Sequence, residues 1–135
     1  MKLQDVYMFF GLLGAAIAPF FGGWDVTLKT LILFFIVDYI SGMIAAGKAG
    51  ELSSRRGLEG IKRKTAMMVA VVFANALDGL ISPNVPVCRQ AVIFACLGNE
   101  GISIIENLGR CGVPVPKVII RFIYQLKDNS KGEEN

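Results

Sequence analysis

Four long apolar runs dominate this sequence of 135 residues. Each run has close to the roughly 20 residues that an α-helix needs to cross the hydrocarbon core of a bilayer. The mean hydropathy of +0.54 is high for a soluble domain, and the length suits one unit rather than several. We therefore expect an all-α integral membrane protein with a single domain over residues 1–126. Its four predicted membrane helices cover about residues 6–23, 30–47, 65–82 and 88–109.

The first run follows Lys2 and carries no charge between residues 6 and 23. A secretory signal peptide shares these features with a membrane helix. Ala16-Ile17-Ala18 resembles a cleavage site, but Pro19 would follow the cut, where proline is poorly tolerated. We therefore expect a retained first span that ends near Pro19, with Trp24 at the membrane interface.

Isolated polar residues interrupt the second and third runs. Asp38 lies in the second run, and Asn75 and Asp78 lie three residues apart in the third, on one face of a helix. The apolar residues of the second run offset about 3–5 kcal/mol, which is about enough to carry one ionised carboxylate across a membrane. Asp38, Asn75 and Asp78 either join helices within one subunit or contribute to a pore or its assembly, and the sequence leaves both roles open.

The fourth run is polar along one face of its predicted helix, with most apolar residues on the opposite side. Two ionised glutamates there would add about 5–7 kcal/mol to the free energy of membrane insertion, whereas the apolar residues lower it by only about 2.4–4.8 kcal/mol. The helix is therefore unstable alone in lipid. Its carboxyl groups must be protonated, or it lies at the surface, or its polar face meets other helices or water. The candidate pore-facing or assembly residues on this face are Asn99, Glu100, Ser103, Glu106 and Asn107.

A water-filled environment is the favoured surrounding for that polar face. The chain offers few cations to bury beside the carboxylates, and Arg89 lies more than two helical turns from Glu100. We hypothesise that resting subunits hide the polar face against the helices of Asp38 and Asp78. Lateral association of subunits then turns it toward a shared aqueous opening.

Residues 48–64 form the most basic segment between any two runs. By the positive-inside rule this loop is cytoplasmic, which places both chain termini in the cytoplasm as well. Basic residues near an anionic membrane contribute about 1 kcal/mol each, and a short loop between two spans favours lipid over nucleic acid as its partner. We expect a short helix here with Leu58 and Ile61 on an apolar edge. The predicted membrane-surface residues are Arg55, Arg56, Lys62, Arg63 and Lys64.

The C-terminal region begins where Pro114 and Pro116 end the fourth helix. Residues 117–126 have apolar side chains at helical spacing opposite basic and polar ones, but they are too few to span a membrane. We predict an interfacial helix there, followed by a disordered polar tail over residues 127–135.

Residue types that bind metals are sparse. The chain has no His, and none of its three Cys forms a CxxC pair with a neighbour. We therefore predict no metal site, and small apolar thiols in membrane helices are the simpler interpretation of the cysteines.

Three separated segments together carry a family resemblance. They are DYISG at 38–42, the basic segment at 52–64, and the polar helix from Asn99 that leads into GVPVP at 112–116. In this order they resemble the toxin-secretion and phage-lysis holin family of Gram-positive bacteria and their phages, over about residues 24–126. The resemblance implies a small protein of the bacterial cytoplasmic membrane that forms homo-oligomers and opens lesions. An endolysin or a large toxin then leaves the cytoplasm through them.

The resemblance implies no enzymatic activity and no cofactor, and it supplies no agreed set of pore residues. An antiholin-like regulator and a narrow ion channel are alternative functions. A small membrane lipid kinase, which also places Glu and Asn on membrane helices, is a third. It would need Mg²⁺ and ATP, yet no Gly-rich phosphate loop is apparent.

Overall fold

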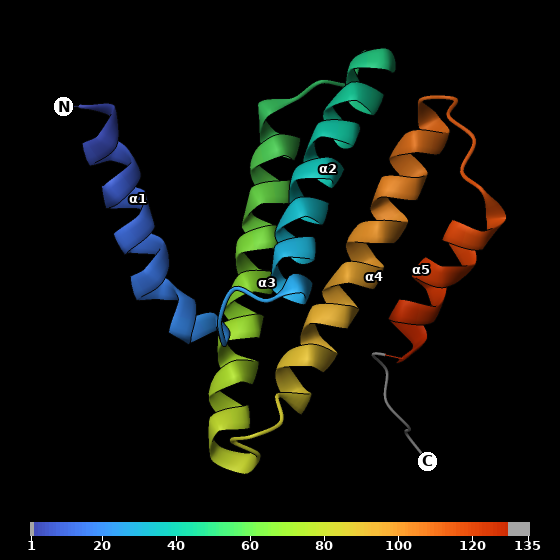
Figure 1. The fold of residues 1–135 in the computed structure, drawn as a ribbon. Coiled ribbons are helices and arrows are strands. Elements are labelled where there is room, and N and C mark those ends of the chain that lie inside the picture. Colours follow the sequence, from blue (N-terminus) through green and yellow to red (C-terminus); the bar gives the residue numbers. More distant parts are fainter. Residues whose placement is uncertain (1, 130–135) are drawn as a thin grey trace.

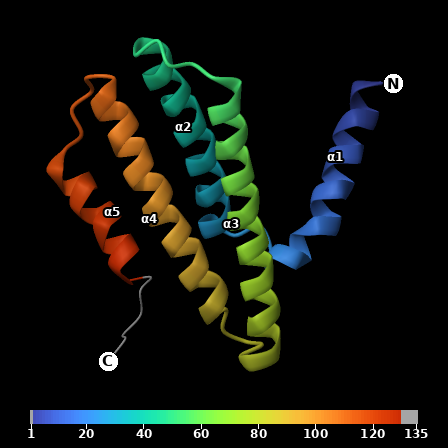
Figure 2. The ribbon, with the colours of Figure 1, turned by 180° about the vertical axis from the view of Figure 1, so that it is seen from behind.

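The computed structural model describes residues 2–129, which form an all-helical structure. Three long helices make a bundle, a shorter helix lies along its outside, and the N-terminal helix stands apart (Figure 1). The view from behind shows the same separation (Figure 2). The elements are α1 (Leu3–Ile17), the 3-10 helix η1 (Ala18–Phe21), α2 (Val26–Lys48), α3 (Ser54–Ile81), α4 (Val87–Arg110) and α5 (Lys117–Asn129).

Four helical segments of the described chain are long and apolar enough to cross a membrane. They are Leu3–Phe21, which joins α1 to η1, and the helices α2, α3 and α4. The predicted all-α fold with four candidate spans and a shorter C-terminal helix is therefore confirmed. The largest difference from the predicted boundaries is in α3, which begins at Ser54 rather than near residue 65.

The short helix expected in the basic segment is thus the first part of α3 and is not separate from the third span. Only residues 49–53 link α2 to α3, and the next eleven residues or so form the first three turns of α3. No proline interrupts these turns, and Arg55 Nε lies 3.4 Å from Glu59 Oε1 one turn later. The 28 residues of α3 are about 42 Å long, against about 30 Å for a hydrocarbon core, so α3 is long enough to project beyond that core.

α1 is apolar around its circumference and packs against little of the chain. None of its residues is buried, and Phe9, Phe10 and Leu12 are each about two-thirds exposed. Its end is tethered, because Trp24 Nε1 donates a hydrogen bond to the carbonyl oxygen of Gly14 at 3.1 Å. A helix with such a surface needs hydrocarbon or another apolar surface around it.

α5 folds back along α4, and two glycines of α4 allow the close approach. A Cβ atom at Gly98 would lie 2.9 Å from the backbone of Lys127, and one at Gly101 would lie 2.7 Å from Ile123. The helix continues to Asn129, so residues 127–129 are helical where a disordered tail was predicted, while 130–135 lie outside the described residues. Packing against α4 stabilises this last turn. α5 thus lies lengthwise against α4, a candidate membrane span, and not flat on a membrane surface as the predicted interfacial helix would (Figure 1).

The apolar core is a thin layer where α2, α3 and α4 meet. Polar side chains lie on both sides of this layer along the bundle axis and are described below. The core residues are Leu28, Leu31, Phe35, Val71, Ile93, Cys96 and Leu97.

Candidate functional site

A group of charged side chains is buried between the three bundle helices, near the middle of α2 and α4. Lys64 of α3 donates a hydrogen bond to Asp38 Oδ2 of α2 at 2.7 Å and another to Glu100 Oε2 of α4. The exposed fractions of Asp38, Lys64 and Glu100 are 7%, 9% and 0%. One ammonium group therefore joins all three helices.

Asn107 and Ser41 extend this group toward the end of the bundle where α2 and α4 terminate. The Asn107 amide donates hydrogen bonds to Asp38 Oδ1 and to Ser41 Oγ, both at 3.1 Å. The Ser41 hydroxyl in turn donates to the backbone carbonyl of Asp38 at 3.1 Å. We call these five residues the central cluster: Asp38, Ser41, Lys64, Glu100 and Asn107.

The central cluster has more negative than positive charge within it. Lys64 faces two carboxylates, and Glu100 Oε1 is buried without a hydrogen-bond partner among the described residues. The nearest further cation is Arg63, whose Nη2 lies 3.6 Å from Glu100 Oε1 and 3.8 Å from Asp38 Oδ2. The Arg63 side chain is 56% exposed, so it compensates this charge from the rim of the bundle. The Phe35 ring also faces the Lys64 ammonium, at 5.3 Å.

The position of Lys64 corrects the sequence analysis, which grouped it with the membrane-surface residues. Because α3 starts about three turns earlier than predicted, Lys64 points into the bundle together with the later buried residues of the same helix. A signal for this existed in the sequence. Lys64, Val71 and Asp78 are spaced by seven residues, which places them on one helix face. The expected membrane-surface residues Arg55, Arg56, Lys62 and Arg63 are exposed.

The predicted polar face of α4 divides into a buried half and an exposed half. Glu100 and Asn107, seven residues apart, belong to the central cluster. Asn99 and Glu106 are exposed on another side of the helix, and Ser103 is half-buried between the two groups. The expectation of few buried cations beside the acidic face was therefore wrong for Glu100, because Lys64 supplies one.

A cavity of about 540 Å³ leads to the central cluster from the end of the bundle that holds the α2–α3 linker. Asp38, Lys64 and Asn107 line it at depth, together with Ser103. Glu51 lines it at the linker and pairs with Arg56 of α3, at 2.8 Å, and with Arg110 of α4, at 3.4 Å. Hydrogen bonding to Arg56 lowers the pKa of the Glu51 carboxyl. Polar groups thus continue from the cluster to the end of the bundle.

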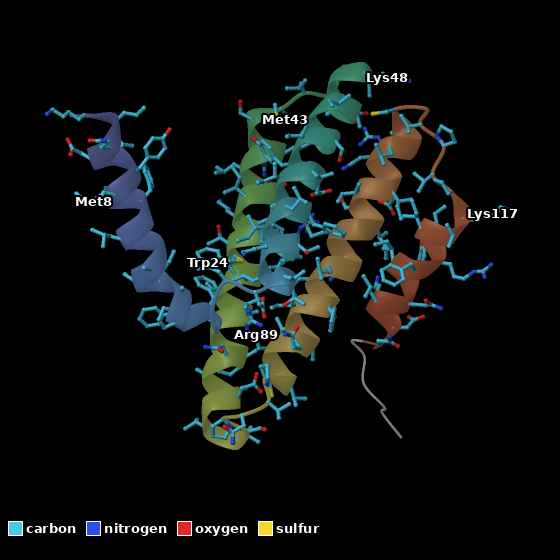
Figure 3. All side chains as sticks on the ribbon, viewed as in Figure 1. Met8, Trp24, Met43, Lys48, Arg89 and Lys117 are labelled. Atoms are coloured by element: carbon cyan, nitrogen blue, oxygen red, sulfur yellow. The ribbon has the colours of Figure 1, made fainter. Side chains whose placement is uncertain are left out.

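A second buried charged group lies on the other side of the apolar core, around Arg89 at the start of α4. The Arg89 guanidinium donates to both carboxylate oxygens of Asp25, at 2.7 and 3.0 Å, and to the carbonyl oxygens of Phe21 and Gly23. Figure 3 labels Arg89 beside the turn that precedes α2. The hydrogen bonds from Arg89 hold the pKa of Asp25 well below its ordinary value.

Asp78 and Asn75 of α3 complete this group. The Asp78 carboxylate accepts hydrogen bonds from the backbone N–H groups of Cys88 and Arg89, both at 2.8 Å, which satisfies two free donors at the start of α4. The Asn75 amide donates to the carbonyl oxygens of Pro19 and Phe20. Both residues therefore join elements within one chain. We call this set the Arg89 cluster: Asp25, Asn75, Asp78 and Arg89.

Gly22 is required where the chain turns past the Arg89 cluster. Its φ of +76° lies in the left-handed region, which disfavours residues with a side chain. A Cβ atom there would also lie 2.5 Å from Asn75 Oδ1 and 2.7 Å from Arg89 Nε. The sequence analysis predicted that Gly22 helps to end the first helix, but not its contacts with this cluster, and it assigned no role to Asp25. Both depend on contacts with residues more than 50 positions away.

Comparison with known proteins places both clusters in a family context. Residues 15–128 match the model of the bacteriophage holin family. The chain belongs to this family. The resemblance identified from the sequence is thereby confirmed, and both clusters lie within the matched residues. Membership identifies the chain as a multi-pass membrane protein of a typically non-enzymatic family and implies assembly in the membrane.

Three relatives of this holin-family chain illustrate the match. An uncharacterised protein of Listeria monocytogenes is 42% identical over 97% of this chain and 94% of its own length. An uncharacterised 14.9 kDa protein of Clostridium perfringens is 37% identical over 86% and 88% of the two chains. A probable holin of Bacillus phage phi105 is 36% identical over 79% of each chain. No solved structure matches the chain.

Proposed function

We propose that this protein acts as a holin, which assembles with copies of itself in the bacterial cytoplasmic membrane and opens lesions there. An endolysin or a large toxin leaves the cytoplasm through these lesions, with no stable complex between the two proteins. Family membership supports the general activity. The observation that carries the mechanism is the buried half of the α4 polar face, held against α2 and α3 by Lys64.

The central cluster accounts for the stability of a closed subunit in lipid. Unpaired, the carboxylates of Asp38 and Glu100 would be costly in hydrocarbon. Lys64 neutralises one charge and hydrogen-bonds both groups, so α4 is stable in the bundle although its sequence is too polar to span alone. The same pairing keeps these polar groups buried inside the closed subunit. When helices separate during assembly, water replaces Lys64 as the partner of these carboxylates and the face lines an aqueous opening.

The distribution of basic residues supports a topology with both termini in the cytoplasm. The basic residues gather at one end of the bundle, where Glu51 links Arg56 to Arg110. Lys48 and the exposed basic residues of the first turns of α3 lie at this end too. The positive-inside rule assigns this end to the cytoplasm. In this orientation Arg55, Arg56 and Lys62 contact anionic lipid headgroups.

Leakage of a folded reporter from cells tests the proposed function. The chain is expressed alone in a bacterium that contains a cytoplasmic reporter enzyme of known size, and the release of K⁺ and of the enzyme are followed together. Release of both supports a holin. Release of K⁺ without the enzyme indicates a narrow ion channel. An absence of killing, with a delay of lysis by a second lesion-forming protein, indicates an antiholin-like regulator.

A further inference from the structure

A second hollow lies on another side of α4, between α2, α4 and α5. Its volume is about 300 Å³. Its walls include Phe34 and Val37 of α2, Gly101 and Ile104 of α4, and Ile119 of α5, and no charged side chain lines it. We call this space the α4–α5 groove. It has no part in the central cluster or in the cavity that leads there.

The α4–α5 groove is a wedge that is closed at one end. At the closed end α5 touches the glycines of α4, where Ile123 and the backbone of Lys127 occupy the space of absent side chains. At the other end the linker 113–116 contains two prolines, which cannot continue a helix and which separate the start of α5 from α4. Figures 1 and 2 both show the two helices converging away from this linker.

The length of the groove corresponds to one membrane leaflet. From Gly101 to the end of α4 at Arg110 the helix rises about 13 Å at about 1.5 Å per residue. Half of a hydrocarbon core of about 30 Å is about 15 Å. A chain that enters at the linker end therefore reaches the closed end near the middle of the bilayer.

Hydrocarbon is the occupant that fits this lining. Water needs two or more polar partners, and the side chains of the groove offer none. If the groove were empty, the side chains that line it would lose dispersion contacts on that side. Since α2 and α4 are membrane spans, acyl chains are the surrounding medium at this depth.

Two lysines lie at the open end of the groove. Lys48 at the end of α2 donates a hydrogen bond to the Cys111 carbonyl oxygen at 3.0 Å, next to the linker. Lys117 directly follows Pro116, which lines the groove, and begins α5. Both lysines are exposed, and Figure 3 labels Lys48 at the end of α2 and Lys117 lower down, at the start of α5. Anionic headgroups of this leaflet would be attracted to both ammonium groups.

We propose that the α4–α5 groove binds one acyl chain of an anionic phospholipid, whose phosphate pairs with Lys48 and Lys117. This site is separate from the basic surface of α3, and its occupation does not depend on lesion formation.

Quenching by brominated lipids tests the site in the full-length chain. Trp24, the single tryptophan, is first replaced by Phe. A reporter tryptophan is then introduced as Phe34→Trp in the groove or, as a matched control, as Phe73→Trp on α3, where the side chain is 64% exposed. Each variant is reconstituted in vesicles of phosphatidylcholine and phosphatidylglycerol in which only one lipid carries brominated chains. Equal helicity by circular dichroism verifies that both variants are folded.

The groove reporter should be half-quenched at a mole fraction of brominated phosphatidylglycerol about fivefold lower than that of brominated phosphatidylcholine. The Phe73→Trp control should respond equally to both lipids. Combining Lys48→Gln with Lys117→Gln should abolish the preference, and Lys29→Gln at the opposite end of α2 should preserve it.

Two results would overturn the proposal. If both reporters follow bulk composition in the same way, the groove makes only ordinary contact with the surrounding lipid. If the groove reporter is protected from every brominated lipid, a protein segment fills the groove, and cross-linking between copies would identify it.

Discussion

The central cluster and the Arg89 cluster both join the three bundle helices through charged side chains, but their bonding differs, and the Asp25 carboxylate of the Arg89 cluster is 41% exposed. In the Arg89 cluster one guanidinium meets one bidentate carboxylate and two carbonyl oxygens, while Asp78 accepts two backbone N–H groups. In the central cluster one ammonium serves two carboxylates, one oxygen of Glu100 has no hydrogen bond, and a cavity adjoins the group. The first arrangement is a fixed clamp. The second is held together mainly by Lys64, with the more exposed Arg63 at its rim.

If the protein opens as proposed, this difference allows one small bundle to be stable and still open. The Arg89 cluster keeps η1, α2, α3 and α4 together at one end. The central cluster is nearer the middle of the span, where water from the adjoining cavity can compete with Lys64 for the carboxylates. We therefore expect helix separation to begin at the central cluster, with the Arg89 end as the fixed point.

Removal of the Lys64 ammonium should have the largest effect. Lys64→Met leaves Asp38 and Glu100 buried without their shared partner, which should cost about 3–5 kcal/mol of unfolding free energy. Unfolding in lipid vesicles or detergent measures this loss, and lysis at equal expression should begin earlier. Lys62→Met, exposed on the same helix, is the matched control. Unchanged stability and timing in Lys64→Met would contradict the role of this residue.

A variant without charges in the central cluster distinguishes the effect of these charges on stability from their effect on opening. Combining Asp38→Asn, Lys64→Met and Glu100→Gln removes all three charges, so no uncompensated charge stays buried, which is the main cost expected for Lys64→Met alone. The triple variant should recover the stability lost in Lys64→Met but open later than the wild type, because it stores less polar surface. A triple variant that lyses cells on the wild-type schedule would show that these charges have no part in opening.

Loss of the Asp25 charge should have a smaller effect and should leave the timing of lysis unchanged. Asp25→Asn retains an oxygen that accepts from the Leu28 N–H at the start of α2, but weakens the bonds to Arg89. We expect a loss of about 1.5–3 kcal/mol in unfolding free energy. A shift in lysis timing as large as that of Lys64→Met would remove the distinction between the two clusters.

The pH dependence of the Arg89 cluster follows from the lowered pKa of Asp25. Since the folded pKa lies below the ordinary value of 3.8, the unfolded chain takes up this proton first as the pH falls. The stabilisation by Asp25 is therefore complete above pH 3.8 and is lost as the pH falls through the folded value. The stability difference between wild type and Asp25→Asn should stay constant from pH 7 to about 5 and shrink below 3.8. A difference that grows on acidification would contradict the ion pair.

The smallest effect on stability is expected at Glu106. This residue is exposed on α4, so Glu106→Gln should change the unfolding free energy by less than about 0.5 kcal/mol. Glu100→Gln, on the buried half of the same helix, should shift lysis timing more than Glu106→Gln does. Equal shifts from the two variants would show that the whole polar face acts together, as the unbroken stripe in the sequence suggested.

Several features were predictable because they depend on local composition and helical periodicity. The four spans, the end of α4 at the proline-rich linker and the amphipathic character of α5 follow from runs and spacings of neighbouring residues. A short helix was expected in the basic segment, but its continuation into the third span was missed because the basic residues indicated a boundary between spans. Lys, Arg and Glu are good helix formers, and nothing in the segment prevents α3 from continuing through it.

The sequence by itself determined that the chain is a membrane protein and that α4 with ionised glutamates is unstable alone in lipid, since both follow from the transfer free energies of its residues. Only the tertiary structure decided which polar groups meet. Lys64 and Glu100 are 36 positions apart, and Asp25 and Arg89 are 64 apart. The side chains on three helices become partners through the register of the bundle, and packing rather than local spacing sets that register.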